Sequence, residues 1–60
     1  METQGTLYTV IEAIRSEYGP DIARVMLDNA ECKDYSRITI GSVVHTLYAQ
    51  GGVWWYHNRP

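Results

Sequence analysis

Sixty residues are enough for one small domain, and a domain of this length buries only about 60% of the surface that its unfolded chain exposes. Hydrophobic residues make up 45% of the chain and charged residues 20%, a composition that favours a folded core and argues against disorder. The formal net charge of −2 argues against an extended basic surface for nucleic acid, although a small basic face can exist on an acidic protein.

The cysteine content and the apolar runs limit the class of protein further. Cys32 is the single cysteine, so the chain can form neither an internal disulfide nor a cysteine-rich zinc site. The stretch Met1–Gly5 has no basic cluster and no apolar run, and nothing in the chain approaches the ~20 apolar residues of a membrane span. These features predict a cytoplasmic protein that makes no contact with a membrane.

The first predicted element is a helix that follows Thr6, a suitable N-cap. Gly19 and Pro20 end this helix, because glycine suits the position after a helix and proline cannot continue one. Its apolar residues recur at helical spacing and form one stripe: Leu7, Val10, Ile11, Ile14 and Tyr18.

A second helix is predicted to begin at Pro20, with the carboxylate of Asp21 near its positive end. Its apolar stripe contains Ile22, Val25 and Met26, and Ala30 could extend it. The pattern fades near residues 28–29, and the polar segment 31–36 is expected to be a loop.

The second half of the chain is predicted to form a third helix and one strand. Residues 37–40 are ambiguous, because they alternate like a strand while Ser36 or Thr39 could cap a helix. Residues 53–57 read as an aromatic strand, followed by a polar tail. The apolar residues assigned to the third helix are Ile40, Val43, Val44, Leu47 and Tyr48, with Gly51 and Gly52 ending it. The expected fold is therefore one mostly α domain with three helices and a small β element.

The segment from Ile38 to Tyr56 resembles the second half of a winged helix-turn-helix domain of the MarR-like and PadR-like regulators. The resemblance is carried by the run from Thr39 to Val53, an amphipathic helix that ends in glycine and enters a strand. It implies a recognition helix that meets DNA through small polar residues. A strand near Ile38 is expected to pair with the strand at residues 53–56 and complete a minimal sheet.

The first functional hypothesis is a small transcriptional regulator of phage or plasmid type that binds double-stranded DNA. Its third helix would enter the major groove, and a homodimer would supply additional contacts. The candidate nucleic-acid-binding residues are Lys33, Arg37, Thr39, Ser42, His45, Thr46 and Arg59. Of these, His45 is expected to lie on a solvated face of the third helix.

The second hypothesis is a protein-binding module or a small inhibitor protein. Tryptophan and tyrosine dominate the energetically important residues of protein interfaces. The candidate interface residues are Tyr48, Trp54, Trp55 and Tyr56, which alternation divides between the two faces of the strand. One face is expected to fill the core. Aromatic rings beside His57 and Arg59 could also hold single-stranded nucleic acid by stacking.

Catalysis and metal binding find little support in the sequence. A catalytic thiol at Cys32 needs an oriented base, and neither His45 nor His57 is placed by the sequence to serve as one. No ligand spacing for zinc is present, and Gly51-Gly52 follows a patterned segment instead of preceding a helix as a phosphate loop does. The expected protein is not an enzyme and carries no cofactor.

Overall fold

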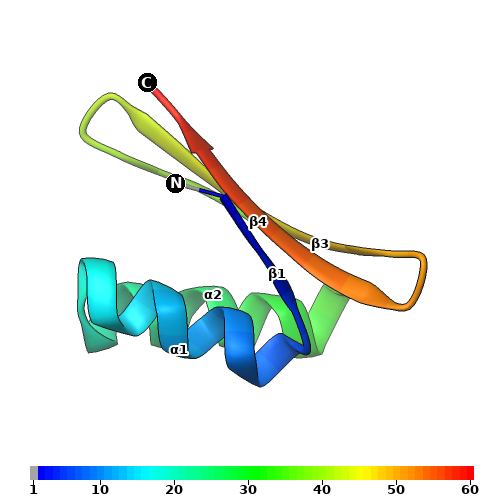
Figure 1. The fold of residues 1–60 in the computed structure, drawn as a ribbon. Coiled ribbons are helices and arrows are strands. Elements are labelled where there is room, and N and C mark those ends of the chain that lie inside the picture. The colour runs from blue at the N-terminus through cyan, green and yellow to red at the C-terminus, as the bar shows by residue number, and fades with distance from the viewer. Residues whose placement is uncertain (1) are drawn as a thin grey trace.

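The computed structural model describes residues 2–60, which form a four-stranded antiparallel sheet with two helices on one side (Figure 1). The elements follow one another as β1 (Glu2–Gly5), α1 (Leu7–Tyr18), α2 (Pro20–Lys33), β2 (Tyr35–Ile40), β3 (Val43–Gln50) and β4 (Val53–Arg59). The strand order is β1-β4-β3-β2, so the first strand pairs with the last. The expected mostly α fold with three helices is therefore wrong.

Both predicted helices in the first half are confirmed. The Thr6 hydroxyl accepts a hydrogen bond of 3.2 Å from the backbone N–H of Thr9, which caps α1, and Gly19 ends it with a φ of 98°. Helix α2 begins at Pro20 and continues to Lys33, one turn beyond the expected end. It continues because Ala30 packs into the core, and Asp34 then adopts the left-handed conformation that aspartate tolerates.

The predicted third helix is wrong, because residues 43–50 form strand β3. Two-residue turns bound this strand: Ile40 pairs with Val43 across one turn, and Gln50 pairs with Val53 across the other. Gly51 and Gly52 both have positive φ, as the commonest two-residue hairpin turn requires. The pair of glycines therefore joins two strands and does not end a helix.

The remaining strands also differ from expectation. The ambiguous residues 37–40 belong to β2, and the expected loop at residues 31–36 is divided between the end of α2 and the start of β2. Strand β2 pairs with β3 and not with β4. Strand β1 pairs with β4 although residues 2–5 show no strand pattern of their own, and β4 extends through the predicted polar tail to Arg59.

The hydrophobic core lies between the helices and one side of the sheet. Both helices turn apolar residues toward this layer, and Leu47 and Tyr56 cover it from the two central strands. Val25 of the predicted stripe in α2 is outside the core and 48% exposed. The buried apolar side chains are Val10, Ile11, Ile14, Ala23, Met26, Ala30, Leu47 and Tyr56. Neither helix within residues 2–60 is long and apolar enough to cross a membrane.

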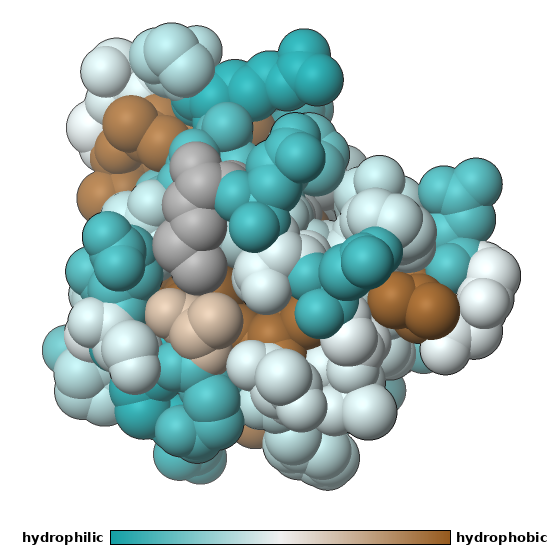
Figure 2. Space-filling model, in the orientation of Figure 1, coloured by the Kyte–Doolittle hydropathy of each residue, from teal (hydrophilic) through white to brown (hydrophobic). Residues whose placement is uncertain are grey.

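Alternation along β4 separates the aromatic residues. Tyr56 is buried against the helices, whereas Trp55 points to the opposite side and is 38% exposed. Trp54 packs at the border of the core. On the surface, apolar side chains gather over the hairpin between β2 and β3, and hydrophilic ones cover much of the helical layer (Figure 2). The sheet thus has one face covered by helices and one uncovered face.

Candidate nucleic-acid interface

The uncovered side of the sheet, which we call the open face, carries the most chemically varied side chains. The register of the four strands aligns them in rows that run across the sheet. One row contains Gln4, Trp55, Tyr48 and Tyr35, and the next contains Glu2, His57, Thr46 and Arg37. A third row contains Arg59, Val44 and Thr39. Because neighbouring strands lie about 4.8 Å apart, side chains within a row are close enough to share one ligand.

Three aromatic rings stand side by side in the first row. Tyr48 and Trp55 lie on the two central strands, and Tyr35 lies at the edge with 43% of its surface exposed. The indole N–H of Trp55 donates a hydrogen bond of 3.2 Å to the carbonyl oxygen of Gln50, which fixes the ring on the sheet. His57 meets Tyr48 edge to face, with ring centroids 5.9 Å apart. These contacts hold a platform of rings in place before any ligand arrives.

The open face is also the more basic side of the molecule. Apart from Glu2, the acidic residues lie on the helices or at Asp34, directly after α2. Within residues 2–60, Arg37 and Arg59 form no ion pair, so their guanidinium groups are available to an anion. The helical layer holds two ion pairs, Arg15–Glu12 and Arg24–Asp28. The net charge of −2 is therefore unevenly distributed, and the acidic excess lies on the helices.

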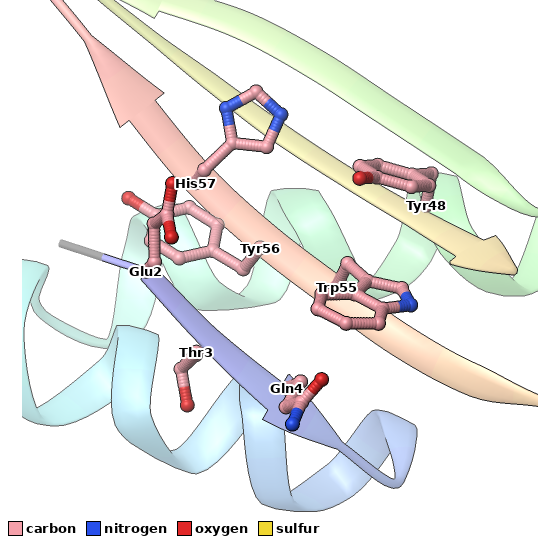
Figure 3. A pocket seen from close by; sticks show the side chains of 7 residues that line it. All are labelled: Glu2, Thr3, Gln4, Tyr48, Trp55, Tyr56 and His57. Atoms are coloured by element: carbon pink, nitrogen blue, oxygen red, sulfur yellow. The ribbon is translucent and has the colours of Figure 1, made fainter.

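A hollow of about 490 Å³ lies at the β1 side of the open face. Figure 3 shows Trp55, Tyr48 and His57 around it, with Glu2 and Gln4 contributed by β1. Thr3 and Tyr56 complete the lining, although alternation directs both toward the helices. The hollow thus combines flat apolar rings with polar groups able to accept and donate hydrogen bonds.

The covered face contains a second group of polar residues, in which His45 and Tyr56 are buried and Tyr18 and Asn58 are partly buried. His45 is only 2% exposed, and its Nδ1 lies 2.7 Å from the Tyr56 hydroxyl. The amide of Asn58 donates to the hydroxyls of Tyr56, at 3.1 Å, and of Tyr18. Burial lowers the pKa of the His45 imidazole and raises the pKa of the Tyr56 hydroxyl, because both charged forms would lose hydration. Both side chains are therefore neutral at physiological pH.

The structure brings together about half of the residues that the sequence nominated. The candidates that share the open face are Arg37, Thr39, Thr46, Arg59, Tyr48 and Trp55. The others lie elsewhere: Lys33 ends α2, Ser42 lies in the turn before β3, and His45, Trp54 and Tyr56 point toward the helices. The expectation that His45 is solvated is wrong, since alternation along a strand turns it toward the core.

Sequence reasoning missed four members of the open face. Tyr35 was assigned to a loop, and His57 was considered only as a flanking group. Glu2 and Gln4 were missed because β1 has no periodic pattern and becomes a strand only by pairing with β4. The one available signal was Gly51-Gly52 between two runs rich in β-branched and aromatic residues, which is typical of a hairpin.

Comparison with known proteins places the chain in no group: no family model, no curated protein and no solved structure matches it.

Proposed function

We propose that the open face binds single-stranded nucleic acid, with bases stacked on Trp55 and Tyr48 and phosphates held by Arg37 and Arg59. The observation that carries the proposal is the row of aromatic rings beside arginines on a sheet face that no helix covers. Proteins that hold single strands combine stacking platforms with positive charge in the same way. Four-stranded sheets with exposed rings bind two or three bases in several RNA-binding modules.

The shape of the open face favours a single strand over a duplex. Bases in a duplex stack on one another and leave no ring face for Trp55, whereas a single strand can spread its bases over the sheet. Residues 2–60 form no third helix that could enter a major groove. The proposed nucleic-acid contact therefore lies on the sheet and not on the expected third helix.

A protein partner on the same face is the second candidate. Trp55, Tyr48 and Tyr35 form the kind of aromatic cluster that dominates protein interfaces. The unpaired arginines favour nucleic acid, because the centre of a protein interface is generally depleted of charge. An interface with protein would also depend little on salt.

A cytoplasmic location fits this proposal. The thiol of Cys32 is exposed, and an exposed single thiol is stable in a reducing compartment. Single-stranded RNA and transiently single-stranded DNA are both available there.

The test is fluorescence anisotropy with labelled single-stranded DNA and RNA of mixed sequence, measured beside a duplex of the same length. Salt is varied between about 50 and 200 mM, the range over which phosphate contacts weaken strongly. We expect single strands to bind more tightly than the duplex. With two phosphate contacts, the slope of log affinity against log salt is expected to be about −1.4.

The tryptophan fluorescence provides a second readout in the same experiment. Stacking of a base on Trp55 is expected to quench its emission, while Trp54 lies at the border of the core and serves as an internal reference. Absence of binding at about 50 mM salt, or a preference for the duplex, contradicts the proposal. In that case a protein partner that binds the aromatic row is the remaining candidate.

A further inference from the structure

Glu2 is the one feature of the open face that does not suit a phosphate-binding surface. It is the only acidic residue in the four strands, and it lies opposite His57 and beside the hollow. A carboxylate repels a phosphate. In the row that contains Glu2, Arg37 occupies the far edge of the sheet, three interstrand spacings or roughly 14 Å away.

The two arginines lie away from the hollow, Arg37 on the edge strand β2 and Arg59 at the end of β4 in the row beyond Glu2. They attract the sugar-phosphate backbone, whereas Glu2 repels it beside the hollow. A nucleotide whose base stacks on Trp55 therefore turns its base edge, and not its phosphate, toward β1. The groups that meet this edge are the carboxylate of Glu2 and the amide of Gln4, which pairs with Trp55.

The chemistry of a carboxylate selects among the bases. An ionised carboxylate has only acceptors, two oxygens that suit two parallel N–H donors. Guanine alone has such a pair on its Watson–Crick edge, at N1 and the exocyclic N2. Adenine and cytosine place a ring acceptor beside their amino group, and thymine and uracil flank one N–H with two carbonyls. In those bases a lone pair faces a carboxylate oxygen and is repelled.

We infer that the hollow beside Trp55 is a guanine site, with the ring stacked on the indole and the Watson–Crick edge bound by Glu2. This inference rests on the proposed binding of single strands and names the base that they present. Gln4 has both an acceptor and two donors, so it supports the base edge without setting the choice.

The test uses labelled oligothymidine strands that carry one central substitution: guanine, inosine, adenine or cytosine. A single guanine avoids the self-association of guanine-rich strands. We expect guanine to bind at least about fivefold more tightly than thymine, the lower limit for a good bidentate contact. Inosine keeps N1–H but lacks the amino group, and its affinity is expected to lie between the two.

Two variants locate the preference on the protein. Glu2→Gln replaces one acceptor with a donor, so the preference for guanine is expected to fall to within about twofold. Affinity for plain oligothymidine is expected to stay the same or rise, because a repulsive charge is lost. Glu17→Gln makes the same change of charge on the exposed surface of α1 and is expected to leave the preference intact.

The possible failures are distinct. Equal binding of all strands overturns the guanine site and leaves single-strand binding in place. A guanine preference that survives Glu2→Gln also overturns it, since the carboxylate then does not read the base. Failure of every strand to bind overturns the proposed function itself.

Discussion

Each face of the sheet carries one histidine and one tyrosine in diagonal positions of β3 and β4, stacked on the covered face and edge to face on the open face. On the covered face, His45 of β3 lies diagonally across from Tyr56 of β4. On the open face, Tyr48 of β3 lies diagonally across from His57 of β4. The ring centroids are 6.1 Å apart in the first pair and 5.9 Å apart in the second.

The difference between the pairs comes from the helices. Beneath them the Tyr56 hydroxyl and the His45 ring form a hydrogen bond, and both side chains are at most 2% exposed. On the open face the rings of Tyr48 and His57 meet edge to face at the surface. Burial therefore makes one pair part of the fold and leaves the other free for recognition. Residue type alone does not distinguish them.

The largest expected effect concerns the buried tyrosine. Tyr56→Ala removes a core ring, the hydroxyl partner of His45 and one of the two hydroxyls to which Asn58 donates, at a cost of about 3–5 kcal/mol. A domain of this length has a total stability of only about 3–9 kcal/mol, so this variant is expected to be largely unfolded. Urea denaturation followed by circular dichroism measures the loss.

The matched change on the open face is Tyr48→Ala. It removes the cross-strand pairs with Tyr35, Trp55 and His57, each worth about 0.2–1 kcal/mol, and is expected to cost about 1–2 kcal/mol, less than Tyr56→Ala. Equal losses for the two tyrosines would mean that the open face contributes to the fold as much as the covered face does.

The next effect is on binding. Trp55→Ala removes a stacking surface worth about 1–3 kcal/mol per base, so affinity for a single strand is expected to fall about 5- to 150-fold while the fold is retained. Tyr8→Ala is the control, because Tyr8 is an exposed aromatic residue on α1 and bonds to Glu31. Anisotropy titrations of both variants show whether binding depends on the open face or on the helical layer. A similar loss for Tyr8→Ala would show that binding is not confined to the sheet.

The pH dependence of stability tests whether His45, which pairs with Tyr56 on the covered face, is buried in its neutral form. Because burial lowers the pKa of His45, the unfolded chain takes up its proton at a higher pH than the folded chain. The contribution of neutral His45 to the free energy of unfolding therefore has its full value above the ordinary pKa of about 6.5. It decreases as the pH falls below that value, by at most about 1.4 kcal/mol per pH unit.

Urea denaturation between about pH 5 and 7.5 measures this contribution from histidine. His45→Gln is expected to be less stable at neutral pH but to lose the dependence, whereas His57→Gln is expected to retain it. A flat profile for the unmodified protein would contradict the burial of a neutral imidazole.

The smallest effect is on the salt dependence of binding. Arg37→Ala removes one phosphate contact and is expected to make the slope of log affinity against log salt shallower by about 0.7. Arg24→Ala removes the same charge from α2, where it breaks the ion pair with Asp28, and is expected to leave the slope unchanged. Identical slopes for both variants would mean that Arg37 contacts no phosphate.

The first half of the fold could be predicted because its information is local. Thr6, Gly19 and Pro20 mark helix ends whatever the rest of the chain does, and the apolar stripes have helical spacing. The second half was predicted wrongly because the apolar residues in 40–48 fit both the spacing of a helix and the alternation of a strand. Val43 and Leu47 fit one face of a helix, yet they also fit alternate positions of a strand.

Part of the candidate site could be predicted for similar reasons. Arg37 and Trp55 stood out by residue type, and they reach the same face by strand pairing. Glu2 and Gln4 could not be nominated, because their role depends on contact with residues more than fifty positions away in the sequence. Which face of β4 is buried could not be decided either, since both faces carry aromatic rings and the helices decide between them.

The pairing of β1 with β4 predicts an order of assembly, because it joins segments that lie about fifty residues apart in the sequence. The helices and the hairpins of β2, β3 and β4 join neighbouring segments, so their formation closes only short loops. Strand β1 has to wait until residues 54–57 have been synthesised and placed in the sheet. It is also the shortest strand and lies at an edge, so its amides are expected to exchange with solvent earlier than those of β3. The side of the hollow that carries Glu2 and Gln4 is thus expected to fold last and to unfold locally first.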